Sequence, residues 1–277
     1  MNRLCLFFVF LLFLPASQQF SLNDAALIAA DPLNIELQDE EHSSAEPEEW
    51  TYKGANGPEH WAEKFPDCGH THQSPIDIEA AQPSDLPAVE FHYQPSPLFI
   101  TNNGHTIQVV FPADKTPENT IKIGNEEYRL LQFHFHQPSE EKLHGRSSDM
   151  VVHLVHGLGE GPKQRLAVVA VLFQRTAGKP NRLMAAIWKH IPQTVSHEPQ
   201  EVPGVKIDAS GFLPSQRGYY TYSGSLTTPP CSEIVTWYIL KKTVPISSAQ
   251  LATFEKYYVN DARPPQAMNG RVIRESK

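Results

Sequence analysis

A surplus of positive charge is absent from this sequence. Its 277 residues include 23 Lys and Arg and 31 Asp and Glu, for a formal net charge of −8. Residues 21–49 contain nine acidic side chains and no basic one, which leaves 22 of each sign in residues 50–277. Proteins that bind nucleic acid normally present a basic surface. We therefore expect no nucleic-acid partner.

An apolar run long enough to cross a bilayer is also missing. The most apolar run covers residues 4–14, whereas a transmembrane helix needs about 20 residues. A positive start precedes this run and a Pro-Ala-Ser sequence follows it, as in a secretory signal peptide. We expect residues 1–20 to be this signal, and the mature protein to be exported, periplasmic or secreted, with no stable membrane insertion. Residues 21–49 are predicted to be a disordered, acidic linker.

Cysteine is scarce. Cys5 lies in the predicted signal peptide, so only Cys68 and Cys231 remain in the exported chain. No Cys-x-x-Cys spacing is present, which argues against a cysteine zinc site. In an oxidising compartment the remaining pair is expected to form one disulfide, and two free buried thiols are the alternative.

Long amphipathic helical stretches are few, and residues 180–190 and 247–258 are the best candidates. Short runs rich in β-branched and aromatic side chains alternate instead with turn-forming residues. The runs expected to form strands are residues 100–101, 106–111, 120–123, 128–136, 150–155, 166–173 and 234–240. Many strands beside few helices predict a mostly β (α+β) single domain over residues 50–277, built on one large sheet with short peripheral helices.

Two histidines stand two residues apart in the sequence Phe133-His134-Phe135-His136. Because side chains alternate along a strand, His134 and His136 share one face while the phenylalanines pack on the other. Their backbones lie about 7 Å apart, so both imidazoles can reach one zinc ion with Zn–N bonds of about 2.0 Å. Buried histidines that are hydrogen-bonded inside a sheet are the alternative.

A third histidine comes from the run that follows. His153 and His156 are three residues apart and point to opposite faces of a strand, so only one of them can join the site. The pattern alone does not choose between them. Three neutral imidazoles with an open fourth position form the ligand set of a zinc site that hydrolyses or hydrates its substrate.

Six segments carry a more specific pattern. They are residues 50–61 (WTYKGANGPEHW), 73–78 (QSPIDI), 102–105 (NNGH), 132–136 (QFHFH), 153–156 (HLVH) and 222–237 (YSGSLTTPP followed by VTW). In this order they resemble an α-class carbonic anhydrase of the exported, prokaryotic-like form. The resemblance implies a mainly antiparallel, twisted central sheet and one Zn²⁺ per chain. It assigns His153 as the third ligand beside His134 and His136, and leaves His156 as a structural residue.

The implied activity is the reversible hydration of CO2 to bicarbonate and a proton, by attack of a zinc-bound hydroxide. By family position, Thr227 accepts a hydrogen bond from that hydroxide and passes its own hydroxyl proton toward Glu140, while Thr228 lines the bicarbonate side. His105 matches the position of the proton shuttle, a task that suits an imidazole.

Further assignments from the resemblance surround these groups. Gln132 serves as the acceptor behind His134, and Asn103 supports the site beside it. Cys68 and Cys231 match the disulfide of many exported members. The residues assigned to the CO2 pocket are apolar, as the substrate is, and they are Val155, Val168, Leu226, Val235 and Trp237.

One position departs from the family pattern. The family carries a glutamate two residues before its third ligand, and that position here is Val151. A metal-bound histidine usually donates its free N–H to an acceptor, and losing the acceptor typically costs about 10–100-fold in metal affinity or activity. We therefore expect weaker or faster-exchanging zinc, unless water or another residue replaces the missing carboxylate behind His153.

Two other functions stay open at this point. A non-catalytic carbonic-anhydrase-like binding domain is one, although such domains usually lack one or more of the zinc histidines. A zinc esterase with another natural substrate is the second, because the same hydroxide attacks activated esters. The oligomeric state, monomer or homodimer, is left open.

Overall fold

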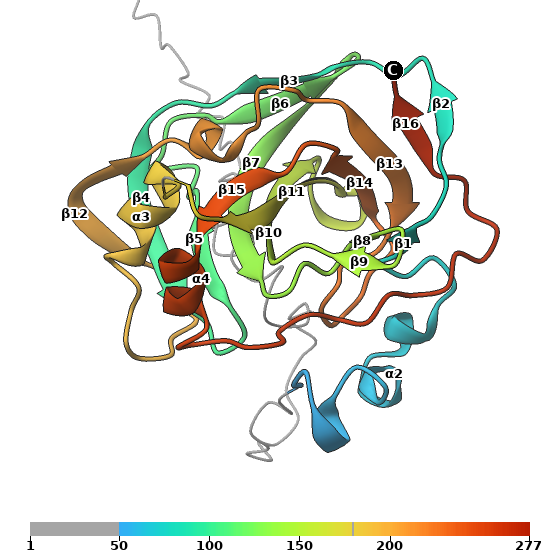
Figure 1. Cartoon of the computed structure of the whole chain (residues 1–277), viewed down its shortest axis with the longest axis horizontal. Helices are drawn as coiled ribbons and strands as arrows, with labels where there is room; N and C mark the ends of the chain where they lie inside the picture. The colour runs from blue at the N-terminus through green and yellow to red at the C-terminus, as the bar shows by residue number, and fades with distance from the viewer. Residues whose placement is uncertain (1–49, 179) are drawn as a thin grey trace, which may run out of the picture.

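A large twisted β-sheet runs through the described part of the chain, residues 50–178 and 180–277 of the computed structural model (Figure 1). The predicted signal peptide and acidic linker, residues 1–49, lie outside the described residues. No helix among the residues that are described is both long enough and apolar enough to span a membrane.

The main sheet has 13 strands in the order β12-β4-β5-β7-β10-β11-β14-β13-β16-β2, with β15 paired to β11 and β6 paired to both β3 and β7. A small second sheet has the order β1-β8-β9. The strands are β1 (Asp77–Ile78), β2 (Gln82–Ser84), β3 (Val89–His92), β4 (Ser96–Asn102), β5 (Ile107–Val110), β6 (Thr120–Ile123), β7 (Glu126–His136), β8 (Lys142–Leu143), β9 (Arg146–Ser147), β10 (Met150–Leu158), β11 (Arg165–Thr176), β12 (Gln200–Ile207), β13 (Tyr219–Gly224), β14 (Val235–Leu240), β15 (Val244–Ser247) and β16 (Arg274–Ser276).

Most strand pairs of the main sheet are antiparallel, and the parallel ones are β11–β14, β11–β15 and β16–β2. Helices are short and peripheral. They are α2 (Trp61–Lys64), α3 (Arg182–Trp188), α4 (Ser248–Phe254) and the 3-10 turns η1 (Gly54–Asn56), η2 (Pro66–Gly69), η3 (Gly161–Lys163) and η4 (Ala209–Phe212). The prediction of a mostly β fold on one large, mainly antiparallel sheet is confirmed.

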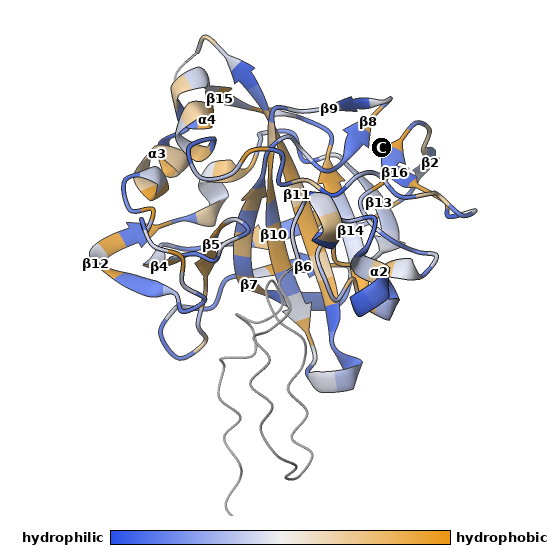
Figure 2. Ribbon diagram, turned by 90° about the horizontal axis from the view of Figure 1, so that it is seen from below, coloured by the Kyte–Doolittle hydropathy of each residue, from blue (hydrophilic) through white to orange (hydrophobic). Residues whose placement is uncertain are grey.

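The central strands are covered on both faces. β10 and β11 carry nearly continuous apolar sequences, as buried strands do, and they form the hydrophobic centre of the sheet in Figure 2. On β7 the alternation divides the side chains: Phe133 and Phe135 enter the large core cluster that α3 and α4 cover. His134 and His136 therefore point to the other face, beside a second apolar cluster that contains Val151 and Trp237.

Both predicted helices form, but each is shorter than expected. α3 begins after Asn181, whose side chain accepts the backbone N–H of Met184 at 2.9 Å. α4 begins after Ser247, which forms a capping box with Gln250. These caps set the first residue of each helix.

Nine strands of the described residues were not among the expected runs, and β12 and β13 are the longest of them. The other seven are β1, β2, β3, β8, β9, β15 and β16. β12 contains Pro203 and Gly204 and is largely exposed at one end of the sheet order, where an edge strand tolerates such residues. β13 carries a tyrosine-rich sequence that continues into the predicted Thr227 segment, and it pairs with β14.

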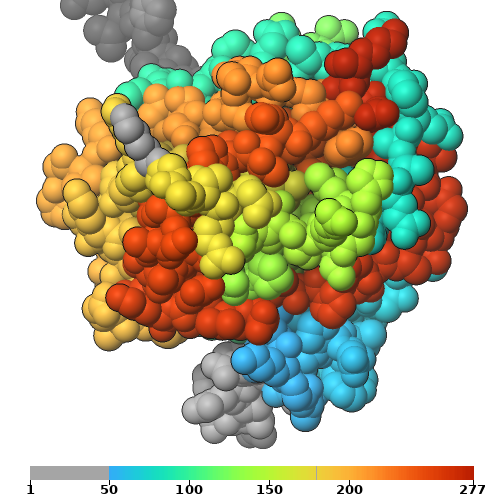
Figure 3. All heavy atoms as spheres, in the orientation of Figure 1, coloured from blue at the N-terminus to red at the C-terminus, as the bar shows by residue number. Residues whose placement is uncertain are grey.

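A disulfide links the N-terminal segment to the loop after β13. Cys68 and Cys231 are bonded, with Cα atoms 4.9 Å apart across a sequence separation of 163 residues. Both pack with Trp50 and Trp61 in a small third cluster. In Figure 3 this N-terminal segment (blue) lies against the C-terminal segment (red), and the Arg263 guanidinium donates to the carbonyl of Cys68 at 3.2 Å.

Replacing both cysteines (Cys68→Ala with Cys231→Ala) is expected to lower the free energy of unfolding by about 2–5 kcal/mol, because the cross-link restricts the unfolded chain over a long loop. Urea unfolding monitored by tryptophan fluorescence measures this loss. The reduced parent protein is the matched control and is expected to unfold at the same urea concentration as the variant. An unfolding midpoint equal to that of the oxidised parent would contradict the prediction.

Candidate metal centre

Three buried histidines converge on one point between neighbouring strands. His134 and His136 come from β7 and His153 from β10, where His153 is the direct cross-strand partner of His134. One nitrogen of each ring lies within 4.8 Å of the other two. His156 is excluded from this group, because its ring bonds to the Tyr93 hydroxyl at 2.7 Å and to the Ala167 carbonyl at 3.1 Å. The structure thus chooses between the two histidines that the pattern left open.

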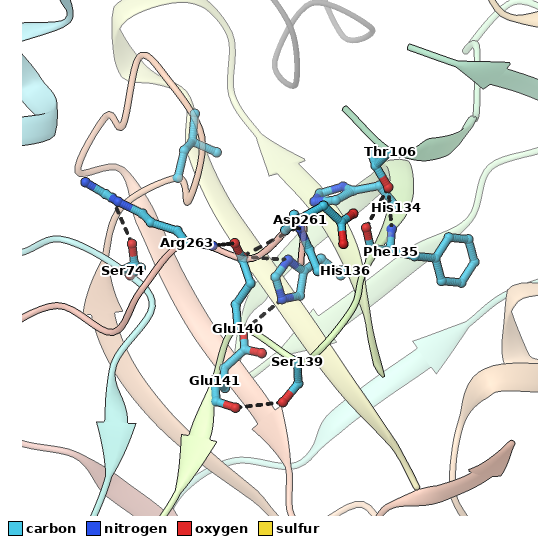
Figure 4. A network of polar contacts seen from close by, with 12 residues as sticks. Ser74, Thr106, His134, Phe135, His136, Ser139, Glu140, Glu141, Asp261 and Arg263 are labelled. Carbon is cyan, nitrogen blue, oxygen red and sulfur yellow. Dashed lines mark hydrogen bonds and ion pairs between the residues drawn. The ribbon is translucent and has the colours of Figure 1, made fainter. Parts of the chain in front are cut away.

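Each histidine of the group commits its other ring nitrogen to a fixed acceptor. His134 donates from Nδ1 to Oε1 of Gln132 at 2.8 Å, as expected. His136 donates from Nδ1 to the backbone carbonyl of Asp261 at 2.7 Å, a contact visible in Figure 4. These bonds leave Nε2 of both rings directed at the common point.

His153 uses the opposite ring nitrogen, Nε2, for its outer hydrogen bond. Its Nε2 lies 2.8 Å from Oε1 of Glu141, so its Nδ1 faces the other two histidines. Val151 supplies no acceptor, and the exception left open for it applies: another residue, Glu141 on the loop after β7, replaces the missing carboxylate behind His153. The expected weakening of zinc binding loses its cause.

The unpaired atoms at this point fit a metal ion. Nε2 of His136 is buried and has no hydrogen-bond partner within the described residues, although buried polar atoms are normally paired. Three imidazoles whose outer nitrogens are hydrogen-bonded to fixed acceptors form the ligand set of a catalytic zinc site, in which the fourth coordination position stays open.

Electrostatics keep two of these rings in the form that binds a metal. Burial lowers the pKa of His134 and of His136 well below the usual value, and the neighbouring imidazoles add to this shift. Burial also acts to lower the pKa of His153, but the carboxylates of Glu141 and Glu140 together outweigh it and the pKa is raised. Neutral imidazole is the ligand form, so the site favours binding at His134 and His136 near neutral pH.

Glu140 lies directly beside the three histidines. Its Oε1 accepts the backbone N–H of Arg263 at 2.8 Å, and its Oε2 lies 3.5 Å from Nε2 of His136 (Figure 4). Burial raises the pKa of Glu140 to about 7, against lowering contributions from His153 and from the Thr227 hydroxyl. The structure therefore brings Glu140 and Thr227 together, as their expected roles require.

The residues assigned to the substrate pocket share one apolar cluster. Val155 pairs with Val168 across β10 and β11, and Val168 pairs with Trp237 across β11 and β14. Val235 is buried with them, and the half-buried Leu226 packs against the same cluster. The Trp237 ring contacts His153 with a centroid distance of 4.8 Å, so this apolar surface reaches the three histidines. Thr228 lies next to Thr227 and is half-buried.

His105 is half-buried and stacks on the ring of Trp50 with a centroid distance of 3.7 Å. Burial lowers the pKa of His105 to about 4, with a smaller contribution from His197. Asn103 fixes the turn here, because its Oδ1 accepts the backbone N–H of His105 at 3.0 Å and that of Thr106 at 2.9 Å. The assigned supporting role of Asn103 thus corresponds to a turn beside the site.

Three contributors were missed at the sequence level. Asp261 acts through a backbone carbonyl, so its side-chain identity carried no signal. Arg263 lies 123 residues from Glu140 along the chain, and no local motif links the two. Glu141 did carry a signal: it is an extra acidic residue beside Glu140, in a chain whose usual carboxylate position holds Val151.

Comparison with known proteins agrees with this geometry. A family model described as eukaryotic-type carbonic anhydrase matches residues 56–277. The chain is 41% identical over 231 residues to a carbonic anhydrase of Neisseria gonorrhoeae, which covers 82% of this chain and 87% of that relative. The solved α-carbonic anhydrase of Photobacterium profundum superposes with a TM-score of 0.74 at 35% identity, over 83% of this chain and all of that one. The α-carbonic anhydrase of Thermovibrio ammonificans in complex with the inhibitor sulfanilamide gives 0.73 at 35% identity, over 83% and 99% of the two chains. The chain therefore belongs to the eukaryotic-type, or α-class, carbonic anhydrase family and is an enzyme of that family.

Proposed function

We propose that this protein is a zinc enzyme for the reversible hydration of CO2 to bicarbonate and a proton, with one zinc per chain held by His134, His136 and His153. The observation that carries the proposal is the arrangement of the three rings. Each ring is hydrogen-bonded at one nitrogen to a fixed acceptor and directs its other nitrogen to the same point.

Zinc bound there supplies a nucleophile by lowering the pKa of water, an effect for which carbonic anhydrase is the standard example. The chain's own residues orient all three imidazoles, and burial keeps those of His134 and His136 neutral. Gln132 and the Asp261 carbonyl hold the Nδ1–H form of two rings, and Glu141 holds the Nε2–H form of the third. Rigid placement of this kind maintains the ligand geometry between turnovers.

Thr227 and Glu140 orient the attack. In the proposed mechanism the Thr227 O–H donates a hydrogen bond to the Glu140 carboxylate. Because the hydroxyl has only this one hydrogen, its oxygen can then only accept a hydrogen bond from the attacking group. Glu140 is fixed for this task by the Arg263 backbone N–H. Alignment of the attacking group with the substrate carbon supplies part of the rate enhancement.

The apolar cluster beside the histidines suits CO2, which carries no charge and gains little from polar partners. Val155, Val168 and Trp237 present a dry surface next to His153. Thr228, which is half-buried, is proposed to line the side of the more polar bicarbonate product. The pocket thus holds the substrate near the metal centre by exclusion of water rather than by hydrogen bonds.

His105 is proposed to carry the released proton toward solvent. Its half-buried ring lies at the N-terminal side of β5, stacked on Trp50. With a pKa of about 4 in this position, the imidazole is neutral at pH 7 and has a free lone pair for a proton. This pKa lies below the value near the working pH that suits a proton relay best, so the protonated ring would be short-lived and would pass its proton on to buffer.

Export is proposed together with this activity. Residues 1–20 would act as the signal peptide and residues 21–49 as an acidic linker ahead of the catalytic domain, residues 50–277. The Cys68–Cys231 disulfide supports this proposal, because disulfides persist in oxidising compartments such as a periplasm or the cell exterior.

Stopped-flow CO2 hydration and zinc content, measured on one preparation of residues 50–277, test the proposal. We expect one zinc per chain and fast hydration that dipicolinate removes and added zinc restores. Hydration is also expected to exceed any ester hydrolysis by the same sample. A folded protein that binds zinc at one per chain and does not hydrate CO2 would contradict the proposed activity.

Substitution of His105 (His105→Ala) is expected to lower kcat by up to about 100-fold in dilute buffer, the lower end of general acid–base contributions. Because the pKa of His105 is about 4, its ring is neutral throughout pH 6–8. The fractional loss should therefore be the same at pH 6 and pH 8, and 50 mM imidazole should reverse it. His92→Ala, an exposed histidine on β3, is the control. Unchanged kcat in dilute buffer would exclude His105 as the shuttle.

A further inference from the structure

The residue two positions before His153 does not serve the metal centre. Val151 is fully buried and packs in the apolar cluster beside the histidines. Its backbone pairs with His136 on β7 and with Leu172 on β11, so it lies on a central strand with a neighbour on each side. An apolar side chain accepts no hydrogen bond, and His153 must therefore find its partner on another element.

Glu141 is that partner. Its side chain is completely buried, and Oε1 lies 2.8 Å from Nε2 of His153. Its Oε2 is buried and has no hydrogen-bond partner within the part of the chain that the structure describes. A buried carboxylate lowers the stability of the folded protein unless it is paired. Here the Glu141 carboxylate is paired with His153 of the metal centre.

The loop that carries Glu141 is fixed at both ends. The Ser139 hydroxyl donates to the carbonyl of Glu141 at 2.8 Å, and the Ser139 backbone N–H donates to the Ser148 carbonyl at 3.0 Å. Directly after Glu141, the backbone N–H of Lys142 donates to the carbonyl of Ile76, where β8 pairs with β1. Figure 4 shows Ser139, Glu140 and Glu141 together on this loop. The carboxylate therefore reaches His153 from a constrained backbone.

The acceptors of the three histidines differ in charge. Gln132 and the Asp261 carbonyl are neutral, whereas Glu141 is a carboxylate. An anionic acceptor makes the opposite ring nitrogen a stronger donor to a metal and fixes the tautomer. Of the three histidines, His153 is therefore the one whose outer nitrogen bonds to a negatively charged side chain.

We propose that Glu141 is the positioning residue for His153, and that its carboxylate on the loop replaces a carboxylate at strand position 151. The inference rests on the proposed zinc site, and it makes zinc retention depend on a residue that contacts neither substrate nor metal. It also predicts that the two positions are interchangeable, because Val151 and His153 share one strand face about 7 Å apart.

The test compares zinc dissociation from the parent protein, Glu141→Gln, and the double variant Glu141→Gln with Val151→Glu. Release is followed with a chromophoric zinc chelator. We expect the dissociation constant for zinc to rise by about 10–100-fold in Glu141→Gln. The double variant should recover most of this loss, which a merely structural role of Glu141 would not allow.

Asp149→Asn is the matched carboxyl-to-amide control. Asp149 precedes β10, and its carboxylate accepts hydrogen bonds from the Gln174 side chain and the Arg175 backbone N–H. The zinc affinity of the Asp149→Asn variant should equal that of the parent protein. If Glu141→Gln does not fold, Glu141→Asp, which withdraws the carboxylate by one methylene, is expected to weaken zinc binding in the same direction.

The outcomes separate this inference from the proposed function. A parent protein that binds no zinc would overturn both. A parent that binds zinc with the same affinity as Glu141→Gln would overturn only the role of Glu141. Weakened binding without recovery in the double variant would overturn the exchange of positions 141 and 151.

Discussion

The fold depends on one requirement: three buried imidazoles must each present a lone pair to the same point. An imidazole has two nitrogens and can turn, so its direction is set only when the outer nitrogen has a fixed acceptor. Here those acceptors are a strand amide, a backbone carbonyl and a loop carboxylate. Two of these three acceptors come from segments outside the central strands, the loop after β7 and the C-terminal segment.

Elements far apart in the sequence meet behind the histidines. β7 and β10 supply the rings, and the C-terminal segment supplies the Asp261 carbonyl. Two residues later, Arg263 holds Glu140 through its backbone, while its guanidinium donates to Gln73 and to the carbonyls of Ser74 and Cys68. The disulfide-linked N-terminal segment is therefore connected to the metal centre through one buried side chain.

Much of the fold and of the ligand set could be predicted from the sequence. Alternation at Phe133–His136 gave the correct faces, because a buried strand sorts its side chains by position alone. The choice between His153 and His156 needed either the family resemblance or the structure, since both lie on one apolar strand. Glu141 carried a signal as an extra acidic residue beside Glu140, but its contact with His153 depends on the path of a loop and was not predicted. Asp261 could not be predicted because a backbone carbonyl leaves no trace in residue identity. β12 was missed for a related reason: an exposed edge strand needs little apolar periodicity.

The central claim is that the outer hydrogen bonds decide which nitrogen of each ring faces the metal. A crystal structure of the zinc-loaded protein tests this most directly. The account predicts one tetrahedral zinc bound at about 2.0 Å by Nε2 of His134, Nε2 of His136 and Nδ1 of His153, with Glu141 still bonded to the opposite nitrogen of His153. Ligation through Nε2 of His153, or a zinc held by only two of these histidines, would contradict it.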